Sequence, residues 1–220
     1  MNTQLARSLS ISLMLAVVLS PATILAAPSV AKSKLAPITT KVQSDYLIQK
    51  GRVGKITKAT TRADLVRLFG AANLEDYTDH GPEGMGEIPA TAVTIAGKRS
   101  IVVWWTDEQR QQPSSVRIMD SRWHTAEGIT IGTTVSQLHQ RFGKFSFYGF
   151  GWDYSGLVVR GNAKLDRYRQ SRQFGFSLGL PENSCSQGEC RLVMGDDTLS
   201  SDNQTVRRLK AQVVEMFVWF

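Results

Sequence analysis

The chain carries one pattern twice: ITKATTRADLVRLFG at residues 56–70 and ITIGTTVSQLHQRFG at residues 129–143. Seven of the fifteen positions are identical without a gap, and the two copies begin 73 residues apart. Chance does not readily produce this identity with the start and stop signals of a helix in register. The repetition therefore predicts two units with the same local structure.

Each copy predicts a short strand, at 53–57 and at 128–131, followed by a helix of about two turns. The Thr-x-x-Asp and Thr-x-x-Gln sequences that begin at Thr61 and Thr134 match the capping box of a helix start. The shared Leu and Phe lie four residues apart on one helix face, and the shared Gly ends the helix. Such a short helix is stable only when it packs on another element.

Alternating apolar residues and turn signals predict strands after each helix. The predicted strands are 91–96, 100–105 and 115–119 in the first half, and 156–160, 174–180, 191–194 and 209–220 in the second. We therefore expect an α+β fold of two tandem repeats, over residues 49–122 and 123–220. Each repeat is expected to be a short helical segment packed on a small antiparallel sheet.

The N-terminus has the features of an export signal. Residues 1–31 contain Arg7 as their one charged residue, then a nine-residue apolar core at 11–19 and Pro21. These features predict a signal peptide. An uncleaved anchor helix is the alternative, but a membrane span needs about 20 apolar residues, more than this core provides. Residues 32–48 are expected to form a polar leader, and the protein to be periplasmic or secreted.

The two cysteines, Cys185 and Cys190, are separated by four residues. An exported chain with an even number of cysteines favours a disulfide bond. A two-cysteine metal site is the alternative, but no further soft ligand lies nearby in the sequence. A redox pair, which usually has two intervening residues, is also less favoured. We predict no metal site and no cofactor.

The pattern Thr-x-x-x-Leu-x-x-x-Phe-Gly after a short strand resembles the repeat of the SmpA/OmlA outer-membrane assembly lipoproteins. It also resembles the tandem units of the β-lactamase inhibitor protein fold. The resemblance covers about 15 residues in each half and implies an exported bacterial module that binds other proteins. The chain departs from the lipoproteins in lacking both their Gly-x-Pro after the helix and their lipid-bearing Cys, so membrane anchoring does not follow.

Aromatic residues are concentrated at 145–154, where six of the chain's 19 lie within ten positions. Trp152, Asp153 and Tyr154, with Phe150, are candidate binding residues, because Trp and Tyr offer large contact areas at low entropic cost. The alternative is that these rings fill the junction between the two predicted sheets. A loop of this density cannot be wholly exposed in a stable monomer.

Trp104 and Trp105 are further candidate binding residues. They end a predicted strand, so their rings point to opposite faces, one toward the core and the other toward a surface. The basic stretch 160–172 is expected to be a solvated strand-turn face or, alternatively, a patch that attracts an acidic partner, anionic lipid or lipopolysaccharide.

The segment 75–87 contains five acids and one His, and it is the best candidate for an enzyme or metal site. The alternative function is thus a hydrolase or metal-dependent enzyme that uses Asp79, His80 and Glu83 with His124 or Asp120. However, the segment lacks EF-hand spacing, and loops of this composition are mostly solvated connections.

The composition excludes a disordered tail or a fibre, since 42% of the residues are hydrophobic and 20% charged. No standard hydrolase motif is present in the sequence. We therefore expect an exported, non-enzymatic module that binds a protein or cell-envelope component, with inhibition of a secreted enzyme as one form. Nucleic acid is not an expected partner, and no membrane span is expected after signal removal.

Overall fold

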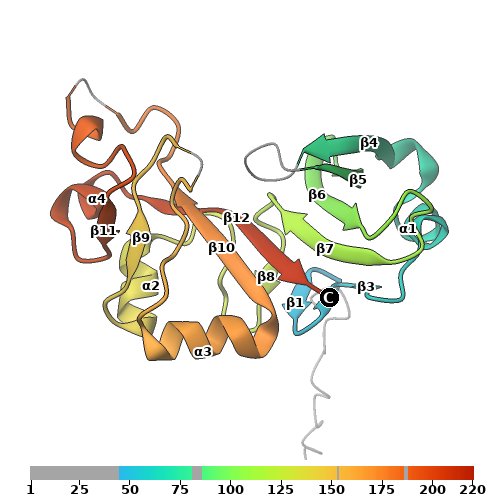
Figure 1. The fold of residues 1–220 in the computed structure, drawn as a ribbon, viewed down its shortest axis with the longest axis horizontal. Helices are drawn as coiled ribbons and strands as arrows, with labels where there is room; N and C mark the ends of the chain where they lie inside the picture. The colour runs from blue at the N-terminus through green and yellow to red at the C-terminus, as the bar shows by residue number, and fades with distance from the viewer. Residues whose placement is uncertain (1–44, 81–85, 153, 186–187) are drawn as a thin grey trace, which may run out of the picture. The chain divides into compact units, whose positions relative to one another are not determined.

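A sheet of six strands organises the structure (Figure 1). The computed structural model describes residues 45–80, 86–152, 154–185 and 188–220. The strands of this sheet are, in spatial order, β10 (Phe174–Gly179), β12 (Gln212–Trp219), β7 (Pro113–Ile118), β6 (Lys98–Trp105), β5 (Glu87–Ile95) and β4 (Leu74–His80). All neighbours are antiparallel. The C-terminal strand β12 thus lies between a strand of each half of the sequence.

Two smaller sheets complete the strand pairing. One has the order β3 (Ile56–Thr57), β2 (Arg52–Val53), β1 (Leu47–Gln49) and β8 (His124–Thr125), with β1 and β8 parallel. The other pairs β9 (Ser146–Tyr148) with β11 (Thr198–Ser200). The α+β class predicted from the sequence is confirmed.

The two helices of the repeated pattern have the predicted form. Helices α1 (Arg62–Phe69) and α2 (Val135–Phe142) each have eight residues and begin with a complete capping box. In each, the Thr hydroxyl accepts the backbone N–H three residues later, and the side chain there accepts the Thr backbone N–H. Both helices end at a glycine with φ near +85°.

Outside the helices the two copies differ. Helix α1 leads through the 3-10 turn η2 (Ala71–Asn73) into β4 at the edge of the large sheet, whereas α2 leads into β9 of the two-stranded sheet. The strands of the two sequence halves also meet in one sheet. The tandem-repeat architecture therefore stays a prediction.

A single large apolar core receives both helices. Leu65 of α1 and Leu138 of α2 are fully buried in it, together with Val93, Ile101 and Val103 from the large sheet. The sequence predicts a hairpin turn at Gly97 and Lys98; the hairpin of β5 and β6 is present, with its turn one residue earlier, at Ala96 and Gly97. Both turn residues have positive φ, as a two-residue hairpin of this type requires.

Several segments differ from their predicted form. The strand expected at 128–131 is reduced to an isolated bridge between Thr130 and His124, and the strand expected at 53–57 is divided between β2 and β3. The acidic segment expected to be a loop forms β4 up to His80, and the basic stretch contains helix α3 (Ala163–Arg172) rather than a strand and turn. The strand expected at 191–194 is replaced by the 3-10 turn η4 (Cys190–Leu192). The strand expected at 156–160 is reduced to isolated bridges. A short helix α4 (Gln204–Arg208), which the sequence did not predict, precedes β12.

The predicted signal peptide lies outside the described residues. The expected leader is described from residue 45 onward, and there Ile48 is buried within β1, so this end of the leader belongs to the fold. Among the residues that the structure describes, every helix is too short or too polar to cross a bilayer.

Leu65→Ala and Leu138→Ala are each expected to lower the free energy of unfolding by about 2–5 kcal/mol, because each leaves a cavity in the core. Leu68 of α1 is exposed and provides the matched control. Leu68→Ala should change the free energy by less than about 1 kcal/mol. Urea denaturation followed by circular dichroism measures all three, and equal effects at Leu65 and Leu68 would contradict the assigned helix face.

Candidate functional site

The aromatic segment 145–154 divides into a buried part and an exposed part. Phe145, Phe147 and Phe150 belong to the core, and the rings of Phe147 and Phe150 lie 5.8 Å apart. Phe150 is thus a core residue rather than the binding residue expected from the sequence.

The other end of this segment is a surface loop. The side chain of Trp152 is 63% exposed and that of Tyr154 is 50% exposed. Asp153, the third residue of the predicted group, lies outside the described residues. The turn is local, since the Ser155 N–H donates to the Trp152 carbonyl oxygen (2.8 Å) and the Gly151 N–H to the Ser155 hydroxyl (3.1 Å).

A second loop, at 190–195, lies against the first. Phe150 donates its N–H to the Val193 carbonyl oxygen (2.9 Å) and accepts the N–H of Gly195 (3.0 Å). The Met194 side chain lies against Gly151, which has φ +91°, and a Cβ at Gly151 would come within 2.3 Å of the Met194 methyl carbon. The positive φ therefore favours glycine where the loops touch.

This second loop adds two exposed apolar side chains, Leu192 (67%) and Met194 (45%). We call Trp152, Tyr154, Leu192 and Met194 the loop patch. Leu192 and Met194 are not recognisable as site residues in the sequence, because the local pattern predicts a strand there and nothing local indicates which distant loop they accompany.

The predicted disulfide is present in the structure. Cys185 and Cys190 are bonded, and their Cα atoms lie 5.6 Å apart. Cys190 is the first residue of η4, so the bond constrains the chain that leads to Leu192. Beside it, Glu189 forms an ion pair with Arg208 of the C-terminal region at 2.8 Å.

Trp104 and Trp105 point to opposite faces of β6, as predicted. Trp105 is buried and donates its indole N–H to the Thr91 hydroxyl (2.9 Å), which in turn donates to the Asp76 carboxylate (2.6 Å). Trp105 is therefore a structural residue and not a binding residue. Trp104 is half-buried and donates its indole N–H to the Asp79 carboxylate (2.9 Å).

The residues of the predicted hydrolase site are not gathered in the described structure. Asp79 and His80 are neighbours on β4, so their side chains leave opposite faces of the sheet. Glu83 lies outside the described residues. Asp120 pairs with Arg122, and the ring of His124 hydrogen-bonds the Arg122 carbonyl oxygen.

Two further arrangements bear on catalysis. Within the described ranges, no three His, Cys, Asp or Glu side chains are placed to hold a metal ion. His139 hydrogen-bonds the Ser201 hydroxyl (2.8 Å), which resembles a base–nucleophile pair. However, Ser201 is fully buried and also accepts the Phe145 N–H, so this contact is structural.

The face of the large sheet opposite the core carries aromatic side chains. Side chains of directly paired residues on neighbouring strands point to the same face of a sheet. On this face one such row crosses from β4 to β12 and consists of Tyr77, Ala90, Trp104, Ser115 and Trp219. This row spans about 19 Å, or four strand spacings. The buried side chains of the described helices all belong to the core on the other side.

Charged groups lie among these rings. Arg117 and Glu215 form an ion pair on neighbouring strands, and Arg99 lies over the Tyr77 ring at 5.4 Å. Burial and the nearby Asp79 carboxylate raise the pKa of Tyr77 above its ordinary value. Tyr77 is therefore neutral at physiological pH.

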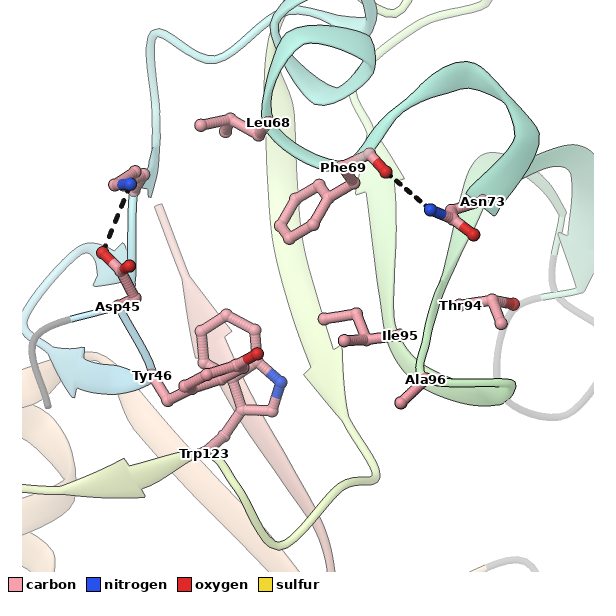
Figure 2. A pocket seen from close by; sticks show the side chains of 10 residues that line it. Asp45, Tyr46, Leu68, Phe69, Asn73, Thr94, Ile95, Ala96 and Trp123 are labelled. Carbon is pink, nitrogen blue, oxygen red and sulfur yellow. Dashed lines mark hydrogen bonds and ion pairs between the residues drawn. The ribbon is translucent and has the colours of Figure 1, made fainter. Parts of the chain in front are cut away.

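Figure 2 shows a pocket of about 300 Å³ beside the C-terminal end of α1. Leu68 and Phe69 lie on one side of it, and the rings of Tyr46 and Trp123, 5.0 Å apart and edge to face, lie on the other (Figure 2). At its rim Lys55 pairs with Asp45 (3.3 Å).

Comparisons with known proteins give little about function. No family model matches the chain, and no curated protein matches it. Among solved structures, the uncharacterized protein yfeY from Escherichia coli is similar, with a TM-score of 0.47 and 15% identity over 80% of this chain and 99% of that one. None of these findings bears on the resemblance to the SmpA/OmlA lipoproteins or the β-lactamase inhibitor fold, which stays a prediction.

Asp76 predicts a pH dependence of stability. Burial alone would raise its pKa, but hydrogen bonds from Arg62 and Thr91 outweigh burial and hold the pKa below 3.8. The stabilisation is therefore present above the unfolded-state pKa of about 3.9 and is lost as the pH falls through the folded-state value. In Asp76→Asn the loss of stability on acidification should be smaller than in the wild type. Urea denaturation at pH 2 to 6 measures it, and identical slopes would contradict the prediction.

Proposed function

We propose that the protein is exported and acts as a non-enzymatic binding module, whose partner is a protein or another component of the cell envelope. The loop patch is the observation that supports this function best. Inhibition of a secreted enzyme is one form that such binding takes, since an inhibitor also presents fixed apolar side chains to its target.

The composition of the patch favours binding. A large apolar side chain exposed alone is ordinary, but four gathered on two adjoining loops are typical of an interaction surface. Trp and Tyr are over-represented among the residues that carry most of the energy of an interface. Methionine adapts its shape to a partner, because its side chain is unbranched and polarisable.

The patch is also held in place before binding. The backbone hydrogen bonds between Phe150, Val193 and Gly195 join the two loops, and the Phe150 ring anchors the first loop in the core. The disulfide constrains the approach to the second loop. Binding by fixed loops costs less conformational entropy than binding by loops that must first become ordered.

Export is supported by two independent features. The N-terminal sequence has the composition of a signal peptide. The disulfide is a bond that persists in oxidising compartments and is rare in the cytosol.

The hydrolase alternative has weaker support. Asp79, one of its expected residues, accepts the indole N–H of Trp104, and the neighbouring His80 leaves the opposite face of the sheet. A general base needs to lie within hydrogen-bond reach of the group it activates. The side chains of Asp79 and His80 lie on opposite faces of the sheet, so they do not reach one common position.

Trp152→Ala and Leu192→Ala are expected to lower capture of the partner at least about tenfold, because truncation of a central interface anchor costs this much or more. The measurement is affinity capture from solubilised native cell envelope on immobilised protein, with quantitative mass spectrometry against the wild type. The thermal melting curve of each variant should match the wild type, since both side chains are exposed.

Leu68→Ala is the matched control, because it also removes an exposed leucine side chain, from α1. It should leave the captured partner unchanged. Unchanged capture by both folded patch variants would refute the loop patch as the binding site. Selective loss with Leu68→Ala would instead place the site at the pocket of Figure 2.

A further inference from the structure

A second pocket, of about 360 Å³, lies where α3 meets the large sheet. Helix α3 leads into β10, an edge strand of the sheet, and contacts it (Figure 1). The pocket is lined by Arg160, Asp166, Arg169, Gln173, Phe174 and Trp219, among others. None of its lining residues belongs to the loop patch.

The Arg169 guanidinium is the chemical centre of this pocket. It is partly buried, and burial together with the positive charge of Arg160 lowers its pKa, while Asp166 acts in the opposite direction. Among the described residues it donates one hydrogen bond, to the Val158 carbonyl oxygen (3.2 Å), and forms no ion pair within 4 Å. A guanidinium has five N–H donors, so most of its capacity is available to a ligand.

The acid in the pocket is already engaged. The Asp166 carboxylate accepts the backbone N–H of Gly161 at 2.9 Å, just before the start of α3. Two guanidinium groups therefore face the space with one carboxylate, which leaves a net positive charge.

The other bases of the stretch differ from Arg160 and Arg169. Arg172 pairs with Glu127 and stacks on the Tyr168 ring, with its guanidinium carbon 4.3 Å from the ring centre. Lys164 donates to the Arg141 carbonyl oxygen. The positive charges of Arg172 and Lys164 are thus engaged in contacts within the protein.

Trp219 supplies a flat wall. Its ring stacks on that of Phe217, with centres 6.1 Å apart and planes 16° apart, and it lies against Gly175. A Cβ at Gly175 would approach the Trp219 ring to 2.5 Å, so the glycine makes room for the indole. The indole remains 45% exposed beside the two arginines.

We propose that this pocket binds a small organic anion, whose carboxylate pairs with Arg169 and Arg160 and whose flat apolar body lies against Trp219. Arginine suits this role because its planar fork forms two parallel hydrogen bonds with a carboxylate. The volume is at the lower end of that of small-molecule sites. This site is independent of the loop patch and of the function proposed for it.

The test compares 2-naphthoate with 2-naphthamide, a neutral probe of nearly the same shape. Nitrogen–proton NMR of the purified protein follows the indole signal of Trp219, assigned with Trp219→Phe, and calorimetry gives the affinities. The naphthoate should shift the Trp219 signal, and the naphthamide should bind at least about tenfold more weakly, since it lacks the charge.

Three variants of α3 sharpen the test. Arg169→Gln should weaken naphthoate binding at least about tenfold, and Asp166→Asn should strengthen it, because the repelling charge is removed while an amide oxygen can still accept the Gly161 N–H. Arg167→Gln changes an exposed arginine of the same helix outside the pocket and should leave the affinity within about twofold.

Several results would overturn the proposal. These are equal affinities for the two probes, no shift of the Trp219 signal with naphthoate, and equal losses for Arg169→Gln and Arg167→Gln. The comparison of the two probes uses the unmodified protein, so the proposal stays testable even where Arg169→Gln fails to fold.

Discussion

The position of β12 is the constraint on which the rest of the structure depends. This strand is formed by the last residues of the chain, yet it pairs with β7 on one side and with β10 on the other. Its inward residues, among them Met216 and Val218, are fully buried in the core that receives Leu65 and Leu138. Without β12 the strands β4–β7 and the remainder of the chain would share no continuous sheet.

Both candidate binding sites follow from this arrangement. Trp219 reaches the α3 pocket because it ends the strand beside β10. The beginning of the same strand and the residue before it hold the start of α2, because Gly132 donates to the Val213 carbonyl oxygen and Val135 to that of Ala211. Helix α2 in turn leads to β9 and the first loop of the patch. The scaffold supplies fixed positions, and the exposed loops and the pocket supply the chemistry. Such a division is common in binding proteins.

The sequence predicted what short-range signals encode. Capping boxes, helix ends, the β5–β6 hairpin and the disulfide each depend on residues within a few positions of one another. Strand β4 was missed because its charged side chains are tolerated at a sheet edge, where one side faces water. Helix α3 was missed because just two of its ten residues, Leu165 and Tyr168, are buried. The insertion of β12 and the meeting of the two loops, through Phe150 and Val193, arise from long-range packing, which no local pattern records.

Native-state hydrogen exchange of the backbone amides tests the central claim most directly, because it reports the opening free energy of each strand separately. The account predicts that amides in β12, β10 and β6 share one opening free energy, equal to that of global unfolding in denaturant. A lower opening free energy for β12 and β10, with β6 still protected, would show two separately folding halves and would contradict it.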